Sequence, residues 1–313
     1  MNKYLTPSTA ILLFAVSASA QTNWTGSINN DFSTAGNWDN GLPDNATNPG
    51  IITSGTPTYD AITNGNLSST NIIQSGGTAS FFTDNQVTFQ NDSVWDLNGG
   101  TIDISGTGRL SLGGTATLNV NGGNLTSSGG GIFWVNSSNA NLSILQDLNT
   151  SVILSQRTGN VLIDNSTLTI GTYNFSNNTS LAALTLQNGG TLNATTIFDY
   201  AGGNNTNQGQ ITFTNGANSL QAAAWDRPAE MQFDFTSTAV GSTITITTGF
   251  YNQTEWETKW TDGELTVDGA NLGSFSDYFT VSGDTLTMVP EPSTYALLGG
   301  LMAIGLALLR RRK

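Results

Sequence analysis

The fold is decided by residues 97–104, which read LNGGTIDI, and by the similar stretch VNGGNL at residues 120–125. Gly-Gly pairs of this kind begin at Gly76, Gly99, Gly122 and Gly189. The first three pairs are 23 residues apart, and the fourth follows 67 residues later, close to three such periods. Short β-prone runs with apolar residues two apart lie between the turns. This spacing is the period of a strand with one buried face.

A repeat of about 20–25 residues made of strands and glycine turns is typical of a solenoid. Because no helical segment separates these strands, the sequence predicts an all-β fold, a right-handed parallel β-helix. Each turn is expected to add two or three strands and to stack Leu, Ile, Val and Phe inward. Asn residues at the turns suit left-handed corners and can stack as ladders. An antiparallel sandwich or meander is the alternative, because Asn-Gly also forms hairpins.

The chain divides into five segments. We expect a signal peptide at 1–20, an N-terminal cap at 21–50, the solenoid at 51–225, a β-rich C-terminal cap at 226–289 and a sorting segment at 290–313. The C-terminal cap contains the best helical candidate, residues 255–260. Its aromatic residues are expected to form a core rather than a sugar platform: Tyr251, Trp256, Trp260, Phe275, Tyr278 and Phe279.

The N-terminal segment has the three parts of a secretory signal. Lys3 supplies the positive charge, and residues 10–16 form a short apolar run. Ala18 and Ala20 are the small residues of a cleavage site before Gln21. The sequence therefore predicts export and removal of residues 1–20, with an ordinary buried helix as the alternative.

A second apolar run, residues 295–309, lies near the other end. It is preceded by Pro290, Glu291, Pro292 and Ser293 and followed by Arg310, Arg311, Arg312 and Lys313. A helix of this length spans about 22 Å, short of the ~30 Å hydrocarbon core. Snorkelling cations and local thinning can make up the difference. We therefore expect one C-terminal transmembrane helix whose basic residues stay cytoplasmic; a soluble core helix is the alternative.

The order of a Pro-Glu-Pro motif, a short apolar helix and an Arg-rich end resembles the PEP-CTERM sorting signal of bacterial surface proteins. The resemblance covers residues 290–313 alone. It implies processing near the motif by an exosortase-like membrane peptidase. The protein would be membrane-anchored by its C-terminal helix and then reach the cell surface or the extracellular space. Proteins of this class are commonly associated with exopolysaccharide and biofilm.

The start of the exported part also resembles a known class. Residues 23–26 read NWTG and residues 37–43 read NWDNGLP. Such a pair resembles the N-terminal stretch of secreted bacterial β-proteins, including autotransporter passengers. We expect Trp24 and Trp38 to plug the open end of the β-core, with sugar stacking as the alternative.

Composition excludes several kinds of chemistry. The chain has no Cys and no His, which removes thiol chemistry, the usual general base and the usual metal ligand. Four basic and 21 acidic residues lie between residues 21 and 289, which leaves a net charge of −17 there. Such a polyanion repels nucleic acid. The acidity serves solubility, or weak calcium binding as the alternative, although no calcium-loop motif occurs. We expect no cofactor and no metal.

Candidate catalytic groups are few. Polysaccharide hydrolysis needs two carboxylates at the bond that is cut, and a lyase needs a basic residue near acids. Asp96, Asp103 and Arg109 form the best such cluster, and Arg157 with Asp164 the second. Neither matches a known motif, so that we expect no enzyme. The sequence predicts a structural or adhesive matrix protein whose partners are exopolysaccharide or other matrix components. A polysaccharide-degrading or carbohydrate-binding β-helix is the alternative.

Overall fold

The computed structural model describes residues 21–44, 48–60, 65–82, 84–176, 182–200, 209–226, 231–248 and 251–290. The predicted signal peptide at 1–20 and the apolar run at 295–309 lie outside these residues. Among the residues described, no helix is long and apolar enough to cross a membrane.

Strands make up nearly all of the regular structure and form two large sheets. The 13-stranded first sheet has the order β1 (Thr22–Asn23), β2 (Gly50–Ile52), β5 (Asn71–Phe82), β7 (Val94–Ile104), β9 (Thr117–Val120), β12 (Asn141–Ile144), β15 (Gly159–Asp164), β17 (Ala182–Gln187), β19 (Gly209–Thr214), β21 (Gln232–Phe235) and β23 (Leu265–Val267). Off this path, β3 (Thr58–Asp60) pairs with β5, and β10 (Asn124–Thr126) pairs with β7.

The 12-stranded second sheet runs beside the first. Its order is β4 (Gly65–Ser68), β6 (Gln86–Gln90), β8 (Arg109–Leu112), β11 (Ile132–Val135), β14 (Ile153–Gln156), β16 (Thr167–Ser176), β18 (Thr191–Tyr200), β20 (Ser219–Asp226), β22 (Thr243–Thr248), β25 (Thr285–Met288) and β24 (Phe279–Ser282). β13 (Leu148–Thr150) pairs with β16. The described helices are η1 (Ala35–Asn37), α1 (Gln253–Asp262) and α2 (Phe275–Tyr278).

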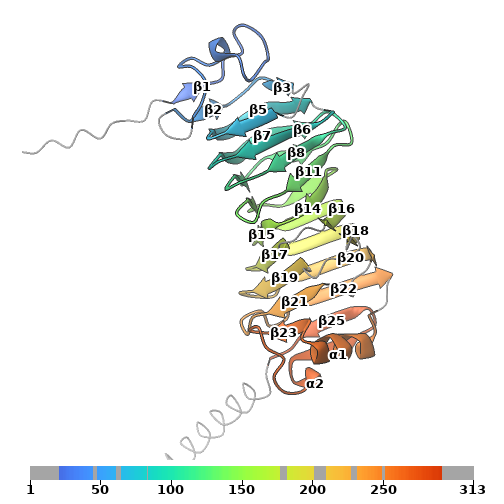
Figure 1. The fold of residues 1–313 in the computed structure, drawn as a ribbon. Coiled ribbons are helices and arrows are strands. Elements are labelled where there is room, and N and C mark those ends of the chain that lie inside the picture. The colour runs from blue at the N-terminus through green and yellow to red at the C-terminus, as the bar shows by residue number, and fades with distance from the viewer. Residues whose placement is uncertain are drawn as a thin grey trace, which may run out of the picture.

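The chain passes from one sheet to the other and back, and each pass stacks on the one before (Figure 1). Neighbouring strands pair in parallel and in register, so that one buried row runs through the first sheet. Its members are Trp95, Leu118, Leu142, Val161, Leu184, Ile211, Phe233 and Leu265. The fold is therefore a parallel β-solenoid of about eight turns. This confirms the predicted β-helix and makes the antiparallel alternative wrong for the body of the chain.

Long strands bend, so that one turn can present three short strands. The first part of β7 pairs with β9, where Val94 meets Thr117. The second part pairs with β10, where Thr101 meets Asn124. The bend falls between them, at Gly99 and Gly100, the position of the repeated Gly-Gly pair.

The Gly-Gly repeat follows from close backbone contact at this bend. A Cβ atom on Gly99 would lie 2.5 Å from the carbonyl oxygen of Ser75 in the preceding turn. Gly100 has φ +76°, a left-handed conformation that side chains rarely adopt. Beside these glycines, Asn121 donates from Nδ2 to Oδ1 of Asn98 over 2.8 Å. At this corner the predicted stacking of asparagines is present as one pair, and the preceding turn has Ser75 in the same place.

Aromatic side chains close the N-terminal end of the solenoid. Trp24 and Trp38 are buried and meet edge to face, with ring centroids 5.2 Å apart. Phe32 packs edge to face on Trp38 at 5.1 Å and stacks with Trp95 of β7 at 6.1 Å. Trp24 and Trp38 therefore plug the core, as predicted, and their burial leaves no face for stacking on a sugar.

Parallel pairing continues beyond residue 225, where the sequence predicted the C-terminal cap to begin. β21 extends the first sheet and β22 the second, both in parallel. Antiparallel pairing appears where β25 joins β22 and β24. The solenoid extends this far because β21 and β22 bury apolar residues two apart, as the earlier strands do.

Helix α1 covers the C-terminal end (Figure 1), around the predicted helical residues 255–260. Asn252 caps it by accepting hydrogen bonds from the N–H groups of Thr254 and Glu255, and the Glu255 carboxylate accepts from the N–H of Asn252. Gly263 ends the helix with φ 76°. The expected aromatic core is also present, with Trp256, Trp260, Phe275 and Phe279 buried.

A buried polar pair links adjacent turns in the middle of the solenoid. The hydroxyl of Tyr173 donates to Oε1 of Gln156 over 2.6 Å, and burial holds the pKa of Tyr173 well above its usual value of 10.0. Nε2 of Gln156 donates to the carbonyls of Gly159 and Ala183, both at 2.8 Å. The tyrosine must therefore stay neutral in the folded chain.

Tyr173→Phe is expected to lower the free energy of unfolding by about 1–3 kcal/mol at neutral pH, because Oε1 of Gln156 loses its donor. In the unfolded wild type this tyrosine ionises near pH 10, but in the folded protein only at higher pH. Its contribution is therefore complete below pH 10 and is lost as the pH rises further. Urea unfolding at neutral and strongly alkaline pH checks this. If the Tyr173→Phe variant loses as much stability between neutral and strongly alkaline pH as the wild type does, the assignment is contradicted.

Candidate functional site

The outer face of the first sheet carries a row of mostly polar side chains. In register it reads Ile73, Asp96, Asn119, Ser143, Leu162, Thr185, Thr212, Asp234 and Thr266. Neighbouring turns bond to each other along it: Nδ2 of Asn119 donates to Asp96 over 2.8 Å, and Thr266 donates to Asp234 over 2.7 Å. These carboxylates are therefore held by amides and hydroxyls of the next turn.

The predicted catalytic cluster of Asp96, Asp103 and Arg109 does not assemble. Asp103 lies beyond the bend of β7, where it accepts hydrogen bonds from Thr126 at 2.8 Å and from the Ser128 hydroxyl at 2.6 Å. Arg109 begins β8, in the other sheet. Within the described residues, Arg109 forms no ion pair with either carboxylate.

The second predicted pair, Arg157 and Asp164, is also apart. Asp164 accepts hydrogen bonds from Gln187 at 2.9 Å and from Asn188 at 2.7 Å, both one turn further along. Among the residues that the structure describes, no ion pair joins Asp164 to Arg157. Charged residues that are close in the sequence are therefore not the ones that contact each other in the structure.

The two arginines instead meet on one tryptophan. Cζ of Arg109 lies 3.9 Å from the ring centroid of Trp134, and Cζ of Arg157 lies 4.9 Å from it. We call Arg109, Trp134 and Arg157 the Arg–Trp–Arg stack. Trp134 belongs to β11, between β8 and β14, and its register partners are Ser111 and Ser155. Both serines are buried beside the half-buried indole.

Sequence reasoning missed this stack, although the repeat contained a signal for it. Trp134 follows Arg109 by 25 residues and precedes Arg157 by 23, so that the three lie about one period apart. Aligning residues on the period, rather than by nearness in sequence, would have grouped them. Guanidinium groups stacked on an aromatic ring retain in-plane N–H donors, which suit carboxylates.

A shallow pocket crosses four turns of the second sheet. A row of register partners runs along it, Thr169, Asn193, Gln221 and Thr245. None of the residues that line it is charged or aromatic. Its polar side chains offer hydroxyl and amide groups, which can make weak contacts with a polar surface, and Ile170 and three alanines complete the lining.

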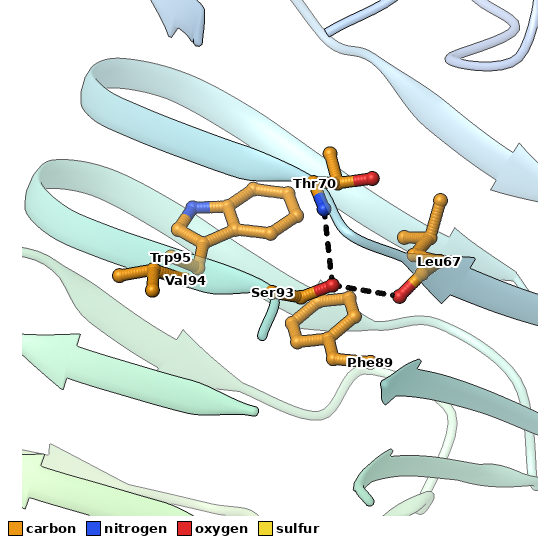
Figure 2. Close-up of a pocket in the computed structure, with 6 residues that line it drawn as sticks. All are labelled: Leu67, Thr70, Phe89, Ser93, Val94 and Trp95. Atoms are coloured by element: carbon orange, nitrogen blue, oxygen red, sulfur yellow. Dashed lines mark hydrogen bonds between the residues drawn. The ribbon is translucent and has the colours of Figure 1, made fainter. Parts of the chain in front are cut away.

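A cavity of about 10 Å³ lies inside the N-terminal turns, between β4, β6 and β7. Figure 2 shows Ser93 within it: its Oγ accepts from the N–H of Thr70 at 3.1 Å and donates to the carbonyl of Leu67 at 3.0 Å. The large side chains around it are Phe89 and Trp95. A space of this size holds at most about one water, so it is a packing gap rather than a binding site.

The folded body ends next to the predicted sorting motif. β25 ends at Met288, and the N–H of Val289 donates to the carbonyl of Tyr278 over 2.8 Å. Of the motif and the basic stop, Pro290 alone lies within the described part of the chain; in the predicted cleavage site, Gln21 alone does. Within that part, no group of three or more acidic, His or Cys residues could hold a metal ion.

Comparison with known proteins gives one match. Residues 289–313 match the PEP-CTERM protein-sorting motif. No curated protein and no solved structure matches the chain. The motif implies export, recognition by an exosortase, which is a membrane protein, and membrane anchoring before processing. The chain is thus a parallel β-solenoid that carries a PEP-CTERM protein-sorting motif, as expected of an exported protein sorted by an exosortase.

Proposed function

We propose that this protein is a non-catalytic structural or adhesive component of a bacterial extracellular matrix. The observation that carries the proposal is the outer face of the first sheet, where carboxylates already accept hydrogen bonds from the next turn, as Asp96 does from Asn119. Engaged carboxylates stiffen a surface, whereas glycoside hydrolysis needs two that converge on a bond. A stiff, polar and acidic rod is suited to presenting many weak contacts to hydrated polymers.

Cell fractionation tests the role. Wild type is compared with a variant that carries Pro290→Ala and Pro292→Ala, with an antibody against the solenoid. We expect the wild type in the surface or matrix fraction and the variant largely retained in the membrane fraction as a longer precursor. Deleting the gene should weaken the cohesion of the matrix. A matrix of unchanged cohesion, with the protein correctly processed, would reject the structural role.

A second candidate function, carbohydrate binding, is favoured by the Arg–Trp–Arg stack on the outer face of β8, β11 and β14.

Degradation of a polysaccharide is the remaining alternative. It is tested by following new reducing ends and unsaturated uronate absorbance on acidic and neutral polysaccharides, with and without calcium. Cleavage that Asp96→Asn or Asp103→Asn abolishes would replace our proposal by an enzymatic one.

A further inference from the structure

Cations are scarce on this rod, and their placement is uneven. Of the four between residues 21 and 289, Arg227 lies outside the described residues, and Lys259 is buried against Glu264. The other two, Arg109 and Arg157, gather on Trp134. In the part of the rod that the structure describes, both solvent-facing cations therefore stack on a single aromatic ring.

The register of the solenoid builds this arrangement. β8 and β14 pair with opposite sides of β11, so that the two guanidinium groups reach Trp134 from opposite directions along the rod. The small side chains of Ser111 and Ser155 flank the indole. Ser111 is fully buried, and its hydroxyl has no hydrogen-bond partner among the described residues. The site therefore combines two positive charges and an aromatic ring, which lie over the buried Ser111.

The chemistry of these groups selects an anionic ligand. A guanidinium that stacks on a ring is fixed in orientation and keeps its edge donors for a planar carboxylate. The Arg109 side chain is exposed, and its guanidinium forms no hydrogen bond or ion pair to another described residue. We infer that the Arg–Trp–Arg stack is a binding site for the carboxylate groups of an acidic, uronate-type polysaccharide. The inference rests on the proposed matrix role and adds the ligand class to it.

The rest of the surface favours a polysaccharide over nucleic acid. A net charge of −17 between residues 21 and 289 repels a duplex, which carries one charge about every 1.7 Å. A uronate chain is less densely charged, and its hydroxyls can bond to the amide and hydroxyl side chains elsewhere on the rod. Two cations on a half-buried tryptophan match one or two sugar carboxylates.

Binding is measured with the full-length chain in a mild detergent. The probes are polygalacturonate, neutral dextran, dextran sulfate and duplex DNA, each at two ionic strengths. We expect the wild type to bind polygalacturonate, more weakly at higher salt, and to ignore dextran. Arg109→Gln/Arg157→Gln should weaken this binding by about tenfold or more, because each charge-assisted hydrogen bond contributes at least about that factor.

A matched control separates a local site from overall charge. Asn160→Asp/Gln232→Glu also makes the chain two charges more negative, but on the outer face of the first sheet. Its affinity for polygalacturonate should fall much less than that of the double arginine variant. Equal losses in the two variants would overturn the site, and so would preferred binding to DNA. A preference for dextran sulfate over polygalacturonate would reassign the site to sulfate groups and overturn the carboxylate proposal.

Thermal unfolding of the same variants tests a purely structural stack. Under our proposal the double arginine variant loses binding while its melting temperature stays close to that of the wild type. A large fall in melting temperature with unchanged affinity would overturn the proposed binding site. In that case the melting temperature of Trp134→Leu shows whether the ring or the charges stabilise the contact between the turns. If the wild type strengthens the matrix but binds no acidic polymer, the site fails and the matrix role stands. If the wild type binds polygalacturonate but deletion of the gene leaves the cohesion of the matrix unchanged, the site stands and the matrix role fails.

Discussion

Gly99→Val is expected to destabilise the solenoid by about 4 kcal/mol or more, at the upper end of what one substitution does. The first atom of the new side chain would lie 2.5 Å from the carbonyl oxygen of Ser75 and 3.1 Å from its carbonyl carbon. These are backbone atoms of the neighbouring turn, which cannot move without breaking the ladder between β5 and β7. In a solenoid each turn contacts only its neighbours, so the damage is expected at one interface.

The consequence is measurable as a loss of cooperativity. The turns before residue 99 should unfold separately from the rest in urea, and brief proteolysis should release an N-terminal fragment. Gly171→Val is the matched control, because a Cβ atom on Gly171 meets nothing within 4 Å and its φ is not in the left-handed region. If the two valine variants unfold alike, the tight approach of the turns at Gly99 does not explain the repeat.

Lys259→Met should destabilise the C-terminal end by about 3 kcal/mol, the lower end of the range for a broken buried charge pair, because the Glu264 side chain is 27% exposed and can be hydrated. Nζ of Lys259 lies 2.7 Å from the Glu264 carboxylate and 3.1 Å from the carbonyl of Met231. The substitution leaves both acceptors without this donor, and the Lys259 side chain is 6% exposed, so that little water can replace it. Hydrogen exchange of α1, β21 and β23 should report the loss.

Two further variants separate the charge pair from general packing. Lys259→Met/Glu264→Leu should recover much of the stability, since an apolar pair of similar volume replaces the ions. Glu257→Gln, on an exposed position of the same helix, should change little. A double variant as unstable as Lys259→Met alone would show that the loss comes from shape rather than from an unpaired charge.

The solenoid could be predicted from the sequence because the closest backbone contact between its turns requires glycine at regular intervals. Only glycine fits where one backbone bend lies on the next, so the pairs at Gly76, Gly99 and Gly122 carry the period directly. The end of the parallel pairing could not be predicted in this way. Phe233 and Ile244 continue the inward pattern without that corner, so that parallel pairing runs past residue 225, where we placed the start of the C-terminal cap.

The charged site was harder to predict, because neighbours in sequence separate at a bend. Asp96 and Asp103 lie on one strand, but the bend in β7 turns them onto different faces, and Arg109 begins the next strand of the other sheet. The partners of each are about 23 residues away, in the next turn, as Thr126 is for Asp103. The partners in neighbouring turns can be read from a single sequence only when the corners of all turns are aligned. In the later turns the Gly-Gly pair at Gly189 lies between β17 and β18 rather than at a bend within a strand, so that it does not align them.

Both ends of this rod are closed by elements that do not repeat: the Trp24 and Trp38 plug at one end, and α1 with the β24–β25 hairpin at the other. Duplication or loss of one period within the gene would therefore change the number of turns and leave both closures intact. Each turn gained would lengthen the rod by about 4.8 Å, the spacing of paired strands. Errors in copying the gene can therefore change the length of the rod in fixed steps, without a new interface having to evolve.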